Sequence, residues 1–258
     1  MKADRNDAQQ FIARLLPPGY AIDRSKGLSV QLYELLRQAI VTMVLQPKEV
    51  IYDRAISDTL GISRTPVREA LLQLAREELV VIAAQSSTYV APVLREQFIE
   101  SAFIRKVLET ASIRRAAEII TEKELEQLKD IHEAHRRAIK RGNSVAAIRH
   151  DNEFHALVSQ AARLPKVQQL VEVVRAPIDR VRHITVRDPK VGEATLRQHQ
   201  KILDTLIKHD PAAAEKALID HLEDAFTWQQ KAFDAKAQMF AGLEKNRHGE
   251  GIGAAIDD

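Results

Sequence analysis

The chain has 258 residues, a formal net charge of +2 and no cysteine, with 45% hydrophobic and 29% charged residues. This is the profile of a soluble globular protein with enough apolar material for two ordinary domains, and it excludes disulfide and thiolate chemistry. No apolar run approaches the roughly 20 residues that a bilayer-spanning helix needs, and the amino-terminal segment lacks the apolar core of a signal peptide. We therefore expect a cytoplasmic protein with no membrane partner.

The first 27 residues are interpreted as an arm and linker. They contain a short apolar cluster whose spacing predicts a brief helix: Phe11, Ile12, Leu15 and Leu16. The helix is expected to end at Pro17-Pro18-Gly19. A helix is predicted over about residues 30–45, where apolar residues recur at helical spacing until Gln46-Pro47 ends it. The sequence assigns no packing partner to the cluster at 11–16.

Two shorter helices follow, at about 54–60 and 66–78, separated by the turn Gly61-Ile62-Ser63-Arg64-Thr65. Gly61 can adopt the positive φ that a tight turn between helices requires. Two β-like runs, at 80–83 and 88–93, then flank a polar tip at 85–87. Two helices joined by a short turn and followed by a small hairpin are typical of a winged helix-turn-helix, which we place at residues 28–95.

The second of these helices has the features of a DNA-reading helix. Thr65 is the expected N-cap and Pro66 the expected first helical residue. One apolar stripe is formed by Val67, Ala70, Leu71 and Leu74. Arginines at 64 and 68 lie at the start of the helix, where they can pair with guanine edges or phosphate. The alternative is that they form an ordinary solvated helix face, because residues 1–95 carry only 12 Lys or Arg against 10 Asp or Glu.

From residue 96 onward the pattern predicts an all-α bundle of about six to seven helices, which we place at 96–240 as a second domain. The predicted helices lie near 96–120, 122–141, 144–161, 165–183, 192–208 and 211–240. They are separated by Gly-Asn, Leu-Pro and Asp-Pro pairs, which are typical of turns that end helices. Residues 241–258 have too little apolar pattern to fold and are predicted to be a disordered tail.

Three of the predicted helices bring potential metal ligands to their apolar faces: Asp151, His155, His199 and His221. Asp151 and His155 are four residues apart, so they lie on one face about one turn from each other. Three nitrogens and one oxygen suit a divalent ion such as Zn²⁺, Ni²⁺ or Mn²⁺, with positions left for water or a ligand. The alternative is that these are core histidines, and periodicity alone does not separate the set from His132, His135 and His150.

The segment Ser63-Arg64-Thr65-Pro66-Val67-Arg68-Glu69-Ala70-Leu71 resembles the DNA-binding domain of the GntR family of transcription regulators. The resemblance implies that Arg64 and Arg68 read bases or adjacent phosphate and that Arg54 supports the DNA backbone. It also implies contacts from Ser63 and Thr65, and from a wing that approaches the minor groove with Ser86 and Ser87 at its tip. The chain departs from the family pattern where that pattern has glycine, at Glu78 and at the wing tip.

Residues from about 97 to 235 look like the helical effector domain of the FadR subfamily, the FCD domain, whose first helix resembles Arg105-Lys106-Val107-Leu108-Glu109. Its metal-binding members use Asp-x-x-x-His plus two later histidines, which implies that Asp151, His155, His199 and His221 are the ligands. The resemblance implies a small carboxylate or sugar acid as effector. Such an effector needs a cationic partner, and the sequence does not choose among four candidates: Arg105, Arg175, Arg182 and Arg187. Because Arg105 lies off the apolar stripe of its helix, it can equally well be a solvent-exposed residue.

Together these features predict a homodimeric, metabolite-responsive repressor or activator that binds a palindromic DNA operator. The alternative from another class is a metal-dependent hydrolase or lyase with a DNA-binding appendage, since a metal with open positions can activate water. No convincing general base is found beyond the ligands themselves, so we expect no enzymatic activity. A structural nucleoid protein is disfavoured by the near-neutral charge.

Overall fold

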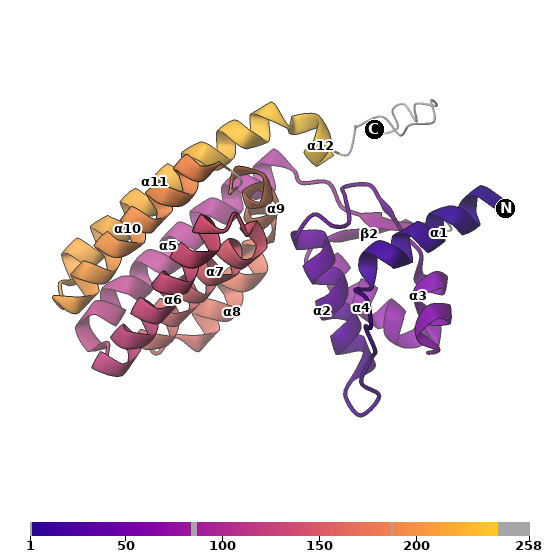
Figure 1. Cartoon of the computed structure of the whole chain (residues 1–258), viewed down its shortest axis with the longest axis horizontal. Helices are drawn as coiled ribbons and strands as arrows, with labels where there is room; N and C mark the ends of the chain where they lie inside the picture. The colour runs from indigo at the N-terminus through magenta and orange to yellow at the C-terminus, as the bar shows by residue number, and fades with distance from the viewer. Residues whose placement is uncertain (1, 84–86, 187, 242–258) are drawn as a thin grey trace.

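The computed structural model describes residues 2–83, 87–186 and 188–241, and it confirms a mainly α fold with one small sheet. Figure 1 shows two bodies side by side, an amino-terminal body that contains the sheet and a carboxyl-terminal helical bundle. The first body comprises α1 (Lys2–Leu15), α2 (Leu28–Val41), β1 (Val50–Ile51), α3 (Asp53–Leu60), α4 (Arg64–Arg76), β2 (Val80–Ile82) and β3 (Thr88–Val90). The bundle comprises α5 (Arg95–Ile119), α6 (Glu122–Lys140), α7 (Ser144–Ala161), α8 (Pro165–Val174), α9 (Ala176–Thr185), α10 (Pro189–Ile207), α11 (Pro211–Ala235) and α12 (Ala237–Ala241).

The amino-terminal arm is a helix that packs on the body of its own chain. Phe11 and Leu15 of α1 are buried in the same core as α2, α3 and α4. Phe11 also meets the ring of Tyr52, with ring centroids 5.5 Å apart. Its helix is longer than the brief one expected, because the polar residues before Phe11 continue the helix along the surface.

The sheet has three strands in the order β1-β3-β2, one more than the expected hairpin. β3 pairs antiparallel with both neighbours, and Tyr89 lies opposite Val50 on one side and Val81 on the other. β1 is only two residues long, so it has no periodicity that sequence reading could detect. Pairing with β3 creates it.

The helix-turn-helix forms as predicted in outline, with one shift at the start of α4. Gly61 has φ of 61° and ends α3 in the left-handed conformation. α4 then begins at Arg64 with Ser63 as its N-cap, so the expectation that Thr65 caps the helix is wrong. Pro66 is the third helical residue, still within the first turn, where a missing N–H costs no intrahelical hydrogen bond. Val67, Ala70, Leu71 and Leu74 are all buried, as the apolar stripe predicts.

In the bundle, two of the expected helices are each divided into two. The predicted helix at 165–183 is interrupted at Arg175, between α8 and α9, because Pro177 has no N–H to continue the helical hydrogen bonds there. The predicted helix at 211–240 ends at Ala235, and α12 turns back so that Phe240 stacks on Phe233. The helices α6, α7 and α10 begin after side chains that cap them, with a complete capping box at Thr121 and Glu124, whereas Leu94 before α5 provides no side-chain cap. Nearly all of the predicted tail at 241–258 lies outside the described residues.

The two bodies share a buried junction. Met43 of the first body joins Phe98, Ile178, Val181 and Phe240 of the bundle in one apolar cluster. Polar contacts cross it as well: the guanidinium of Arg180 on α9 donates to the carbonyl of Ala91 at 2.8 Å, and Arg37 on α2 donates to the carbonyl of Glu172 at 2.7 Å. Among the described residues, no helix is long and apolar enough to span a membrane.

Candidate functional site

Four buried side chains from three helices meet inside the bundle. Asp151 and His155 come from α7, His199 from α10 and His221 from α11. Each offers one ligand atom, and these atoms all lie within 4.8 Å of one another. The structure thus brings together the four residues that the sequence resemblance implies.

The carboxylate of Asp151 is the centre of this cluster. Its Oδ2 lies 2.6 Å from the guanidinium of Arg182 and 3.8 Å from Nε2 of His155, and its Oδ1 lies 3.5 Å from Nε2 of His199. Burial by itself raises the pKa of Asp151, but the charge of Arg182 above all outweighs it and holds the pKa well below its usual range. The carboxylate is therefore ionised and available as an oxygen ligand.

Outer partners orient two of the imidazoles. Nδ1 of His155 lies 2.7 Å from the carboxylate of Glu109, which in turn pairs with Arg105 at 2.6 Å. Nδ1 of His221 lies 3.0 Å from the side-chain oxygen of Gln198. A donated Nδ1–H fixes the tautomer that leaves Nε2 as a lone-pair donor, the usual arrangement around a metal-binding histidine. Sequence reading missed Glu109 and Gln198 as partners of the site; the only local signal was the i,i+4 spacing of Arg105 and Glu109.

The donor set fits a divalent metal ion. Nε2 of His155 and both ring nitrogens of His199 are buried and have no hydrogen-bond partner. Burial, reinforced by neighbouring histidines, lowers the pKa of His221 to about 3 and the pKa of His199 well below its usual value, so both rings are neutral near pH 7. A neutral, unpartnered imidazole nitrogen deep in a protein is costly unless a ligand occupies it. The imidazoles of His155, His199 and His221 beside the ionised carboxylate of Asp151 could hold Zn²⁺, Ni²⁺ or Mn²⁺.

The other candidate histidines lie outside this set. His132 and His135 on α6 approach His199, with ring centroids 6.4 and 5.5 Å apart, but neither belongs to the group of four. His150 on α7 is partly buried and pairs with Glu153 at 2.7 Å. Helical periodicity did not show which histidines form the candidate metal site, and the distances between the helices select His155, His199 and His221.

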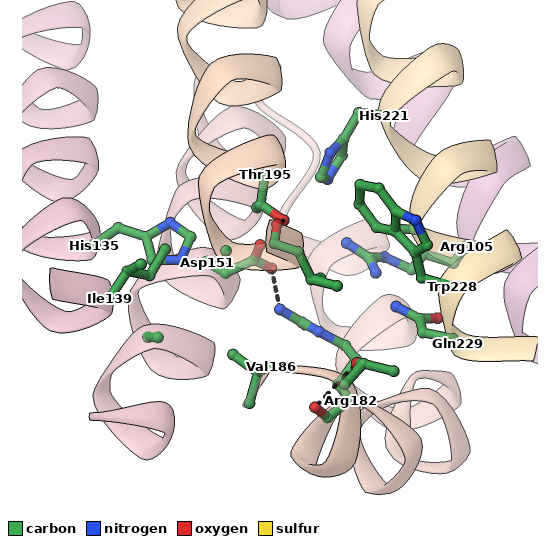
Figure 2. A pocket seen from close by; sticks show the side chains of 15 residues that line it. Arg105, His135, Ile139, Asp151, Arg182, Val186, Thr195, His221, Trp228 and Gln229 are labelled. Atoms are coloured by element: carbon green, nitrogen blue, oxygen red, sulfur yellow. Dashed lines mark hydrogen bonds and ion pairs between the residues drawn. The ribbon is translucent and has the colours of Figure 1, made fainter. Parts of the chain in front are cut away.

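A small cavity of about 40 Å³ adjoins the cluster (Figure 2). Asp151 and His221 form part of its wall, together with Arg105, Arg182, His135, Thr195, Trp228 and Gln229. The reading of Arg105 as a solvated residue is wrong, since its side chain is buried against Glu109. Arg182 also lines the cavity, whereas Arg175 pairs with Asp179 and does not line it. Arg187 lies outside the described residues.

Every candidate DNA-reading residue that the structure describes is on the surface of the first body. The structure exposes Arg54, Ser63, Arg64, Thr65, Arg68 and Ser87, and Ser86 lies outside the described residues. Arg54 pairs with Asp58 at 3.6 Å across exposed side chains, and the exposed Arg64 pairs with the partly buried Asp53. Such exposed pairs are weak and can be exchanged for phosphate contacts.

Comparisons with known proteins agree with this layout. The sequence model described as "Bacterial regulatory proteins, gntR family" matches residues 28–90, and the one described as "FCD domain" matches residues 100–224. The chain is 33% identical over 203 residues to the HTH-type transcriptional repressor RspR of Escherichia coli K12, covering 79% of this chain and 89% of that protein. It is 25% identical over 182 residues to the HTH-type transcriptional regulator McbR of the same strain, covering 70% and 81%.

Solved structures show the same fold. The E. coli McbR/YncC structure superposes with a TM-score of 0.73 at 21% identity, covering 81% of this chain and 99% of that one. A putative GntR transcriptional regulator from Rhodococcus sp. RHA1 superposes with a TM-score of 0.69 at 20% identity, covering 80% and 99%.

Proposed function

Because the chain belongs to the GntR family of bacterial regulatory proteins and carries an FCD domain, we propose that it is a DNA-binding transcription regulator controlled by a small carboxylate at a metal-containing pocket. The family and its relatives are transcriptional regulators, not enzymes, so the hydrolase or lyase alternative is set aside. The proposed division is an arm at 1–27, a DNA-binding domain at 28–95 and an effector domain at 96–240. RspR is named a repressor, which favours repression for this chain.

The observation that carries the sensing half is the set of buried imidazole nitrogens without hydrogen-bond partners beside ionised Asp151. When bound, a divalent ion would supply coordination positions for a carboxylate oxygen of the effector. Asp151, His155, His199 and His221 would hold it, while Glu109 and Gln198 fix the ring orientations.

The cavity next to this cluster suits a small anion. Arg105 and Arg182 bring two guanidinium groups to its wall, and Thr195 and Gln229 bring groups that can hydrogen-bond. Both arginines are already paired with protein carboxylates, Arg105 with Glu109 and Arg182 with Asp151. An arriving carboxylate would therefore compete for Arg182, and this competition would change the contacts of α9.

α9 offers a route from the cavity to the DNA-binding body. Arg182 faces the cavity, and two residues earlier Arg180 donates to the carbonyl of Ala91, just beyond β3 of the wing. A movement of α9 caused by the effector would thus act on the segment that carries the wing. Linkage requires that an effector which weakens DNA binding itself binds more weakly to the DNA-bound protein.

The DNA contacts are proposed for Arg64 and Arg68 in the major groove, Arg54, Ser63 and Thr65 on the backbone, and Ser86 and Ser87 at the wing tip. A homodimer is proposed because one reading helix spans only a few base pairs and a palindromic operator matches a two-fold axis. An apolar stripe on α5 supports it: Ile99, Phe103 and Val107 follow one another at four-residue spacing and are 42%, 66% and 52% exposed. A solvent-facing stripe of this kind is typical of an interaction surface.

The test is metal analysis of the purified wild-type protein beside His199→Ala, His221→Ala and the control His132→Ala. We expect near-stoichiometric metal in wild type and in the control, and loss in the two ligand variants. Adding metal to the chelator-treated protein should raise the melting temperature of wild type and the control only, because a ligand that binds the folded state stabilises it. A metal-free wild type that added metal does not stabilise would reduce the four residues to core residues and leave the DNA-binding half standing.

A further inference from the structure

We propose that α1 forms a second wall of the DNA-binding surface and contacts the phosphate backbone beside the groove that α4 reads. The contacting face is the α1 wall, defined as Ala8, Gln9, Ile12 and Ala13. This inference rests on the proposed DNA-binding function of Arg54, Arg64 and Arg68. The helix precedes the segment 28–90 that matches the gntR family, so the family assigns no role to it.

α1 is held in a fixed position by its opposite face. Phe11 and Leu15 are 1% and 3% exposed in the core of the first body. Arg14 forms an ion pair with Glu49, in the turn that precedes β1. Since these contacts anchor α1, its remaining face keeps a defined orientation toward the neighbouring elements. Figure 1 shows α1 lying along the same side of the body as α3, against which it packs.

That remaining face borders a groove of about 1090 Å³. The groove runs from the α1 wall across β1 and α3 to the exposed side of α4 and on to the wing strands, and among its lining residues are Arg54, Arg64, Arg68, Ser87 and Thr88. The α1 wall and the proposed DNA-reading side chains therefore line one continuous depression. A duplex that engages Arg64 and Arg68 must lie over this depression.

The charges in the groove favour a polyanion as its occupant. Three arginines and two aspartates line it, Arg54, Arg64 and Arg68 against Asp53 and Asp58, so its balance is positive by one charge. Arg68 has no ion-pair partner among the described residues, whereas Arg54 pairs with the exposed Asp58 and Arg64 with the partly buried Asp53. The α1 wall itself has no charged residue: Ala8 and Ala13 allow close approach of a backbone, and the amide of Gln9 can donate to a phosphate oxygen. Contacts of this type position a protein on DNA in most complexes, and they do not depend on base sequence.

The test compares two neighbouring residues of α1, because Gln9 lines the groove and Gln10 is exposed but does not line it. Full-length Gln9→Glu, Gln9→Lys, Gln10→Glu and Gln10→Lys carry pairwise identical net charges. Their affinities are measured by fluorescence anisotropy on a labelled duplex that the wild-type protein enriches from a random-sequence pool. Thermal melting of each variant checks that the fold is retained, which is expected because both side chains are on the surface.

We expect Gln9→Glu to weaken binding about three- to tenfold and Gln9→Lys to strengthen it by a similar factor, with much smaller effects at position 10. For Gln9→Lys, the plot of log affinity against log salt should steepen by about 0.9, the value for one added phosphate contact. Equal effects at positions 9 and 10 would overturn the proposal, since they would reflect net charge alone. Tighter binding by Gln9→Glu would also overturn it, because α1 would then obstruct DNA or face another protein segment. Failure of the wild type to enrich any duplex would instead refute the proposed DNA-binding function itself.

Discussion

Glu78 follows α4 with φ of 56°, a left-handed conformation in a position where the family pattern has glycine. A side chain with a Cβ carries strain in this region that glycine does not. We expect Glu78→Gly to be more stable than Glu78→Ala by about 1 kcal/mol, because both lose the hydrogen bond from Gln97 but only alanine keeps the strain. Urea unfolding of the two variants measures this difference. Equal stabilities would show that the turn relaxes around Cβ.

His135 makes the stability of the metal-free protein depend on pH. Burial lowers its pKa to about 4, so the folded chain stays unprotonated there while the unfolded chain takes up a proton near pH 6.5. The unfolded state therefore binds more protons between these values, and the free energy of unfolding decreases as the pH falls from 6.5 to 4.

His135→Gln is expected to remove up to about 3 kcal/mol of this loss in chelator-treated protein. Urea unfolding at pH 7 and pH 4.5 gives the comparison, with the exposed His209→Gln as control. A pH dependence that is the same in His135→Gln and in wild type would contradict the assignment.

At the scale of elements, α9 carries two buried arginines with opposite energetic roles. Arg182 neutralises Asp151 and Asp179, at 2.6 and 3.2 Å. Arg180 has no carboxylate partner among the described residues, and burial lowers its pKa to about 10. A buried charge with only a carbonyl partner costs free energy, so its retention fits a role in linking α9 to Ala91.

We expect Arg180→Met to leave the unfolding free energy of chelator-treated protein unchanged or higher, and Arg182→Met to lower it by about 3–5 kcal/mol because the buried Asp151 loses its arginine partner, while Asp179 keeps Arg175. Denaturant unfolding tests this pair. Arg180→Met should also weaken the effect of a bound carboxylate effector on DNA affinity while retaining metal. Strong destabilisation by Arg180→Met would assign that arginine to the fold alone.

The α4 element shows how far local rules reach. Its apolar stripe and the left-handed Gly61 were predictable, since both depend on residues within one or two turns. The first residue of α4 was not predictable, because Ser63 and Thr65 are both acceptable N-caps and any position in the first turn of a helix accepts a proline such as Pro66. The break between α8 and α9 had a visible signal in Pro177, which the continuous apolar pattern obscured.

At the scale of the whole molecule, the exposed stripe on α5 predicts the assembly. Phe103→Glu is expected to weaken dimerisation about 100-fold or more, because a carboxylate would be buried without a partner at the interface. Sedimentation velocity across a concentration series measures it, and Val145→Glu, another exposed apolar position, provides the control. If the Phe103→Glu protein remains dimeric, the dimer interface lies on another surface. Weaker binding to a palindromic duplex should accompany the monomer.

The sequence by itself determined the two-part organisation, most helix boundaries and the pairing of Asp151 with His155, because capping, proline geometry and helical periodicity act over a few residues. The tertiary structure alone decided which later histidines join that pair and which partners orient them. It also created β1, buried Arg105 and placed α1 beside the arginines that we propose read DNA. These features depend on distances between helices far apart in the chain, and such distances are set by the packing of the whole core.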